Sequence, residues 1–218
     1  MKRTLILVVG LSVAGAVLAQ AQIIDGSRRS RDPIAWTSLS IGWFHQNGFC
    51  DADSQACWDF ASAPQWRGTL GVPLGRGATI GVAASTARVP LIYNGFAGGA
   101  IATNTCGGCD ADANVTQYFG NLHIGNGSGF QQVIDLNAGM TVFSNFRTSS
   151  GGTRLGGKAA SNFTFALGYG FGYSFTPRAQ IMVLQEYGLV ILKRQTGSSN
   201  NTAQQTNLRI GFKYGLGN

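Results

Sequence analysis

The sequence predicts an all-β protein, namely an eight-stranded antiparallel up-and-down transmembrane β-barrel with short periplasmic turns and four long outer loops. Three observations predict it: residue types alternate with a period of two, the connections alternate in length, and charge is scarce. Only 11% of the residues are charged, whereas about 25% is usual for a soluble domain. Because a water-facing surface would need more charge, we expect most of the outer wall to face lipid.

The clearest alternation lies in residues 161–175, SNFTFALGYGFGYSF. Phe, Leu and Tyr occupy every second position, and Asn, Thr, Ala, Gly and Ser occupy the others, which is the period of a β-strand. The segment 207–216, NLRIGFKYGL, repeats the pattern. Weaker versions predict six more strands, at 35–46, 65–74, 78–88, 115–125, 130–143 and 178–192.

The connections between these strands fall into two groups. Tight turns that carry Gly, Pro or Asn are expected at 74–77, 125–129 and 175–178. The other connections are long and polar. This layout, with short turns on one rim and long loops on the other, is typical of an up-and-down barrel. The four long loops are expected at 47–63, 89–114, 144–158 and 193–206.

A soluble eight-stranded barrel of the lipocalin kind is the alternative for such a pattern. Its polar positions would carry Lys, Glu and Asp to meet water. Here those positions hold mainly small residues that fit inside a narrow barrel, while the aromatic and aliphatic residues form a continuous set that suits lipid. We therefore expect a membrane barrel, with its apolar residues outside and its small polar residues inside. Its candidate interfacial aromatics are Trp43, Trp66, Tyr118, Tyr173 and Tyr214.

The first 21 residues have the pattern of a secretory signal peptide. Lys2 and Arg3 precede an apolar run, and a small-residue site follows at 19–21. A retained anchor is the alternative, but a membrane span needs about 20 apolar residues, and this run is shorter. We expect a signal peptide at 1–21, a periplasmic tail at 22–34 and the barrel at 35–218. The basic cluster at 27–32 is typical of a solvated tail, so no nucleic-acid partner is expected.

Together, the signal peptide, the strand count, the alternation of turns and loops, and the closing strand 207–216 make the chain similar to a known class. It resembles the small eight-stranded outer-membrane barrels of the OmpA transmembrane-domain and opacity-protein type, over about residues 35–216. The resemblance implies an integral outer-membrane protein whose partners are outer-membrane lipid and the barrel-insertion machinery. The insertion signals of that class usually end in an aromatic residue, whereas this chain ends in Leu216, Gly217 and Asn218.

The polar positions of the predicted strands also carry charges that would lie in the lumen. Because buried charges persist only when paired, and Glu186 and Arg209 lie on neighbouring strands at similar heights, we expect these two to pair, with Arg67 approaching across the lumen. The pair would plug the barrel, so conductance should be small or absent and should rise in Glu186→Ala. The expected lumen charge network consists of Arg67, Asp135, Glu186, Arg209 and Lys213.

The motif Cys-Asp-Ala-Asp occurs twice, at 50–53 and 109–112. Export permits disulfides, so Cys50 with Cys57 and Cys106 with Cys109 are the expected pairs, although four cysteines allow three connectivities. A thioredoxin-type dithiol would need a βαβ context, which is missing. No cofactor is expected. As an alternative, oxygen atoms from the two loops could share one calcium ion, although neither loop has the Gly and the Glu of an EF-hand loop. Those oxygens belong to Asp51, Asp53, Asp110, Asp112 and Asn114.

A lipid-modifying enzyme is a further alternative, because lipid A deacylases and palmitoyltransferases exist on this fold, and they need a His with a Ser and an acid near the outer rim. His45 with Ser54 and Asp59 matches no family spacing, and His123 lies close to a short turn. We therefore expect no enzymatic activity. The expected function is a structural role in envelope integrity, with a narrow or closed pore. A surface adhesion or binding module that acts through the outer loops is the alternative, and the sequence identifies no surface ligand.

The charges of the loops predict a polarised outer rim. Acidic residues belong to the first two loops, and basic residues lie in or beside the last two. The acidic set is Asp51, Asp53, Asp59, Asp110 and Asp112, and the basic set is Arg147, Arg154, Lys158, Lys193 and Arg194.

Overall fold

The computed structural model describes residues 33–53, 55–75, 77–95, 107–125, 127–155, 158–193 and 201–217. The expected signal peptide and most of the expected tail lie outside these residues. Within the described part of the chain, no helix is long and apolar enough to cross a membrane.

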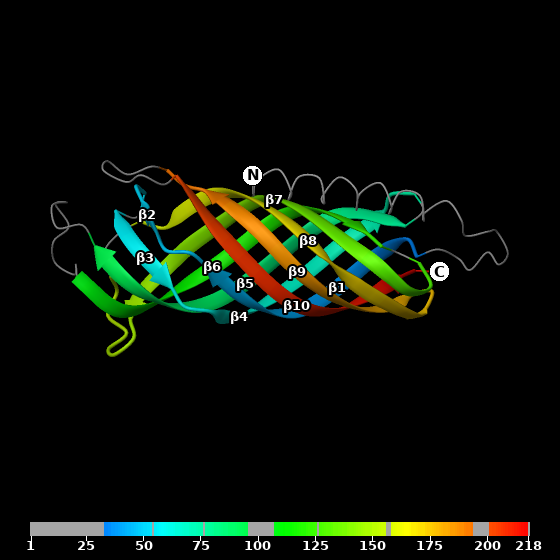
Figure 1. Cartoon of the computed structure of the whole chain (residues 1–218), viewed down its shortest axis with the longest axis horizontal. Helices are drawn as coiled ribbons and strands as arrows, with labels where there is room; N and C mark the ends of the chain where they lie inside the picture. Colours follow the sequence, from blue (N-terminus) through cyan, green and yellow to red (C-terminus); the bar gives the residue numbers. More distant parts are fainter. Residues whose placement is uncertain are drawn as a thin grey trace, which may run out of the picture.

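Eight long strands form a closed barrel in which each strand pairs antiparallel with the next and the last pairs with the first (Figure 1). The predicted eight-stranded up-and-down barrel is therefore confirmed. Two short strands, β2 (Phe49–Asp51) and β3 (Ala56–Phe60), lie outside this ring. The ring consists of β1 (Ala35–Gln46), β4 (Ala63–Pro73), β5 (Ala78–Gly95), β6 (Gly107–Ile124), β7 (Gly129–Thr148), β8 (Ala160–Thr176), β9 (Ala179–Ile191) and β10 (Thr202–Leu216).

The strand register fixes the width of the barrel. A row of paired residues that starts at Asn162 of β8 and follows the register once around the ring returns to β8 at Gly172, which is 172 − 162 = 10 residues further on. With a strand spacing of ~4.8 Å and a rise of ~3.3 Å per residue, the strands tilt by about 40° and the backbone radius is about 8 Å. A barrel of this width is filled by its own side chains.

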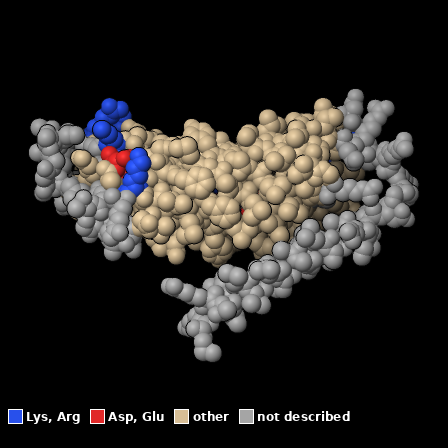
Figure 2. All heavy atoms as spheres, turned by 90° about the horizontal axis from the view of Figure 1, so that it is seen from above, with Lys and Arg blue, Asp and Glu red and all other residues tan. Residues whose placement is uncertain are grey.

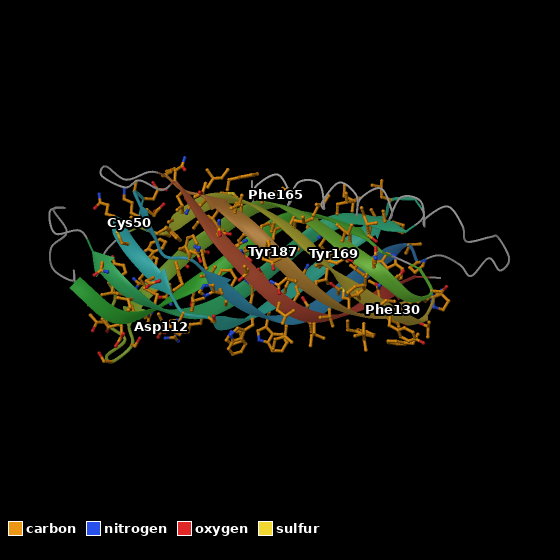
Figure 3. All side chains as sticks on the ribbon, in the orientation of Figure 1. Cys50, Asp112, Phe130, Phe165, Tyr169 and Tyr187 are labelled. Carbon is orange, nitrogen blue, oxygen red and sulfur yellow. A yellow bond between two sulfur atoms is a disulfide. The ribbon has the colours of Figure 1, made fainter. Side chains whose placement is uncertain are left out.

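The wall is apolar and the interior is polar, as the alternation predicts. Along β8, every second residue from Phe163 to Phe175 is exposed, and most of the small residues between them are buried. In the view of Figure 2, the blue and red side chains gather at one end of the molecule, and the barrel wall beside them is formed mainly by other residues. Figure 3 places Cys50 and Asp112 at that long-loop end and Phe130 near the short-turn end.

Several strands extend further toward the long-loop end than the sequence predicts. The expected strand 78–88 runs to Gly95, and the expected strand 130–143 runs to Thr148. The sequence pattern does not predict these extensions because the apolar residues there face the inside of the barrel instead of the outside. On β5, the inward residues Val89, Leu91 and Tyr93 are apolar and buried, which is the arrangement of a water-soluble barrel.

The long connection expected at 47–63 contains regular structure that the sequence does not predict. In this segment β2 and β3 form a hairpin, and β3 pairs with β5 beyond the end of β4 (Figure 1). Trp58 of the hairpin is 2% exposed, and its ring centroid lies 5.1 Å from that of Phe143 and 4.7 Å from that of Phe146. The long-loop end therefore has a hydrophobic core of its own. We call this cluster the outer core; its large members are Phe44, Phe49, Trp58, Phe60, Leu91, Tyr93, Phe143, Phe146 and Leu192.

Candidate functional site

Arg67 and Glu186 form the central contact of the lumen. Arg67 Nη1 lies 2.7 Å from Glu186 Oε2, and Arg67 Nη2 lies 3.0 Å from Oε1. Both side chains are buried. The expected contact of Glu186 with Arg209 is present but longer, at 3.4 Å. The planar guanidinium of Arg67 thus donates one hydrogen bond to each oxygen of the Glu186 carboxylate, which is the strong bidentate form of this ion pair.

Asp135 is the second carboxylate of the lumen, and Arg209 and His123 both bind it. Arg209 Nη2 contacts Asp135 Oδ2, and His123 Nδ1 lies 2.6 Å from Oδ1. Asn137 Nδ2 donates to Glu186 at 2.9 Å, which completes the cluster. His123 is not among the residues expected in this network, although it is buried and is paired with Asp135 in the β6–β7 register.

Lys213, the fifth residue of the expected network, lies nearer the short-turn end. Its Nζ donates to Thr79 Oγ1 at 3.3 Å and lies 4.8 Å from the centre of the Trp36 ring. A cavity of about 10 Å³ beside Lys213, Asp135 and His123 is lined mainly by polar residues. It has room for roughly one water molecule.

A layer of amide and hydroxyl side chains separates the charges from the outer core. Gln117 is its hub. Its Oε1 accepts hydrogen bonds from Gln65 at 3.0 Å and Ser85 at 2.9 Å, and its Nε2 donates to Thr141 at 3.1 Å and Gln205 at 2.9 Å. These bonds cross-link five strands through the lumen. We call this set the amide layer, so the lumen contains three stacked layers: charges, amides and the outer core.

The strand register also places the aromatic residues of the wall. At a tilt of about 40°, one residue along a strand corresponds to about 2.5 Å of height along the barrel axis. Four aromatic residues of the wall lie at the same height to within about that distance: Trp43, Trp66, Tyr118 and Tyr187. We call this set the outer girdle. Tyr187 was not among the expected interfacial residues. A second level, with Tyr173 and Tyr214, lies roughly 18 Å nearer the short-turn end, which is consistent with an apolar band between two aromatic girdles.

Two ion pairs between described residues lie at the long-loop end. Lys193 lies 2.9 Å from Asp53, which joins the fourth loop to the first, and Arg88 lies 3.2 Å from Asp112. The hydrogen bond that Lys193 donates to the Asp53 carboxylate is the main cause that raises the pKa of Lys193. Asp51 is fully buried. The Asp53–Lys193 pair joins the acidic first loop to the basic fourth loop. Of the charges expected at the rim, Arg194 lies outside the described residues.

The two Cys-Asp-Ala-Asp segments have separate surroundings. A disulfide joins Cys50 to Cys57 and staples the β2–β3 hairpin. Cys109 is also disulfide-bonded, and Cys106 lies outside the described residues.

The expected calcium site is not found in the described ranges, where no three His, Cys, Asp or Glu residues cluster as metal ligands. The physical reason is the sheet order. Asp51 belongs to β2 and Asp53 follows it, whereas Asp110, Asp112 and Asn114 lie on β6, with β3 and β5 between. This corresponds to about 14 Å along the sheet.

The residues considered for catalysis do not form a triad. His45 Nδ1 lies 3.3 Å from the hydroxyl of Ser62. Ser54, the serine that the sequence offers, lies outside the described residues. Among the described residues, no carboxylate lies within 4.0 Å of the His45 ring. A serine–histidine contact without an orienting acid is a weak basis for nucleophilic catalysis.

No family model matches the chain, and no curated protein matches it. Among solved structures, it is similar to Neisserial surface protein A, with 10% identity, a TM-score of 0.51 and coverage of 84% of this chain and 97% of that chain. Two others are the attachment invasion locus protein Ail of Yersinia pestis (15% identity, TM-score 0.40, 83% and 99% covered) and the outer membrane protein OprG of Pseudomonas aeruginosa (14%, 0.45, 86% and 98%). At such identities the first likeness shows the fold. With its closed ring and its wall of exposed apolar side chains, the chain is an integral eight-stranded β-barrel of the cell outer membrane.

Proposed function

We propose that this protein is a closed outer-membrane barrel with a structural role in the cell envelope and without enzymatic activity. The observation that carries the proposal is the filling of the lumen by three successive layers. Arg67 and Glu186 bridge it from opposite walls, Gln117 cross-links five strands, and Trp58 packs among the aromatic rings of the outer core.

The layers oppose ion passage for different reasons. An ion at the charge layer would have to displace a bidentate, buried ion pair. An ion at the outer core would lose its hydration among aromatic rings without gaining a polar partner. A barrel filled in this way serves as a rigid membrane body rather than as a pore.

Planar-bilayer recording of the purified, refolded protein tests closure. We expect no stable single-channel steps, and steps of constant size would show a porin instead. The envelope role is tested by deleting the gene and measuring survival in detergent and in low-osmolarity medium. Complementation by the wild type should restore survival, and a deletion strain as resistant as its parent would argue against the role.

A second candidate, a surface-binding module, is favoured by the folded state of the long-loop end. The Cys50–Cys57 disulfide, the Asp53–Lys193 ion pair and the hydrogen bond from Ala52 N to Lys193 O at 3.1 Å hold the β2–β3 hairpin in place. Preorganised surfaces bind partners at a lower entropic cost. Replacing the hairpin with a short glycine-serine linker should abolish adherence to host surfaces, and leave barrel assembly intact, if this candidate is correct.

A further inference from the structure

The apolar wall carries a hollow over β4, β5 and β6. The hollow has a volume of about 790 Å³. Its floor consists of Gly68, Ala84 and Gly120, and its rim includes Leu70, Tyr118 and Met140. We call this feature the wall trough. All of these residues lie on strands of the barrel.

The glycines of the wall trough are not required by the backbone. A Cβ added to Gly68 would meet no atom within 4 Å, and one added to Gly120 would meet only Ala138 O, at 3.7 Å. Neither glycine has a positive φ. By contrast, a Cβ on Gly170 would fall 1.9 Å from Val183 O, so that glycine is a steric necessity. Glycine within a strand weakens it and often marks a close approach of another molecule.

The wall trough lies at a defined depth in the membrane. The register places its floor just to the membrane side of Trp66 and Tyr118 of the outer girdle. This is the level of the acyl chains of the outer leaflet, directly below their headgroups. The wall trough is therefore continuous with the lipid-facing surface, and hydrocarbon is the material that reaches it.

A cation lies above the wall trough. Arg88 is on the same outward face of β5 as Ala84, four residues toward the long-loop end, and thus about 10 Å higher along the axis. Its side chain is 68% exposed, and its contact with Asp112 uses one nitrogen, Nη2, at 3.2 Å. The remaining donors of the guanidinium are at the level of lipid headgroups, where the planar fork suits a phosphate.

We propose that the wall trough and Arg88 together bind one phosphorylated lipid of the outer leaflet. A saturated acyl chain fills the wall trough and packs against its glycine floor, while the phosphate pairs with Arg88. The acyl chain supplies the apolar contacts that bulky side chains at positions 68 and 120 would otherwise supply. Because the choline cation of phosphatidylcholine offsets the charge of its phosphate, Arg88 favours a phosphorylated headgroup with a net negative charge.

Native mass spectrometry of the full barrel, released from nanodiscs that contain equal amounts of dimyristoyl phosphatidylglycerol and dimyristoyl phosphatidylcholine, tests the proposal. The wild type should retain one lipid, with phosphatidylglycerol favoured about threefold, as an exposed ion pair provides. The double variant Gly68→Leu/Gly120→Leu should retain no lipid. Because an added Cβ meets no close atom at either position and the rest of each side chain would point into the wall trough, the thermal stability of this variant should not fall.

Two further variants separate the parts of the site. Val183→Phe adds four carbons to an exposed position on β9, the same number that each Gly→Leu change adds, and should retain lipid like the wild type. Arg88→Gln should keep one lipid but lose the preference for phosphatidylglycerol. Retention by Gly68→Leu/Gly120→Leu equal to that of the wild type would overturn the proposal. So would a wild type that retains no lipid, or a dimer that the double variant abolishes, since the occupant would then be a second copy.

Discussion

Arg67 of β4 and Glu186 of β9 meet across the lumen through two hydrogen bonds, of 2.7 and 3.0 Å, between one guanidinium and one carboxylate. Glu186 also receives a hydrogen bond from Asn137 and lies 3.4 Å from Arg209. The carboxylate is therefore the point at which four strands are tied together. Its removal should affect the whole barrel rather than one strand pair.

The first prediction concerns stability. Glu186→Ala leaves Arg67 buried without its carboxylate, and breaking a buried pair in this way costs about 3–5 kcal/mol. We expect a loss of that size in urea unfolding of the protein in lipid vesicles. The double variant Arg67→Met/Glu186→Leu replaces the pair with apolar side chains and retains the Arg209–Asp135 contact. It should recover most of the loss, and a double variant as unstable as Glu186→Ala would contradict this account.

The second prediction concerns conductance and revises the expectation drawn from the sequence. Because the amide layer and the outer core lie above the charge layer, Glu186→Ala alone should leave planar-bilayer recordings without steps. A variant that truncates one side chain in each layer, Trp58→Ala/Gln117→Ala/Glu186→Ala, should conduct. Heat-modifiable electrophoresis must show that both variants are folded. Steps in Glu186→Ala alone would mean that the charge layer is the only seal.

The sequence predicts the membrane-spanning part of this barrel well because its pattern is local. On β8, large apolar residues occupy one face and small residues the other, so the strand and its orientation follow from residues 161–175 alone. Beyond the outer girdle the same strands continue with the apolar residues inside. The apolar residues of β5 move there from the outward face of the strand to the inward face. The outward apolar pattern therefore ends before the strand does, and the sequence predicts a loop for the far end of β5.

The β2–β3 hairpin and the ion-pair geometry depend on contacts between distant segments. The inward position of Trp58 is stabilised by Phe143 and Phe146 of β7, which no local pattern in the first loop reveals. Parity and height predict that Arg67, Glu186 and Arg209 lie together in the lumen, but the choice of Arg67 over Arg209 as the bidentate partner of Glu186 depends on side-chain conformation. A lone His such as His123 gives no signal until the β6–β7 register sets it opposite Asp135.

The third prediction tests where lipid meets the wall. Ile210 is an exposed residue of β10 between the two aromatic levels, and Ile92 is an exposed residue of β5 beyond the outer girdle. Ile210→Arg should cost about 2–4 kcal/mol, as a cation near the middle of the bilayer does, whereas Ile92→Arg should cost about 0–1 kcal/mol. Unfolding free energies in vesicles measure both. Equal losses of unfolding free energy in the two variants would show that the lipid-facing part of the wall does not end at the outer girdle.

The last prediction concerns the staple of the first loop. The Cys50–Cys57 disulfide closes a loop with a sequence separation of 7, and a crosslink over so short a loop restricts the unfolded chain by about 2–3 kcal/mol. Cys50→Ser/Cys57→Ser should therefore raise opening of the β2–β3 hairpin, while the barrel strands keep their pairing. Hydrogen-exchange mass spectrometry should show faster exchange in residues 49–60 and unchanged exchange in β8 and β9, which do not contact the hairpin through the sheet ladder. A reductant should reproduce the effect in the wild type and add nothing in the variant. If exchange in 49–60 stays slow without the disulfide, then the packing of Trp58 and Phe49 in the outer core holds the hairpin by itself, and the disulfide is dispensable for the folded long-loop end.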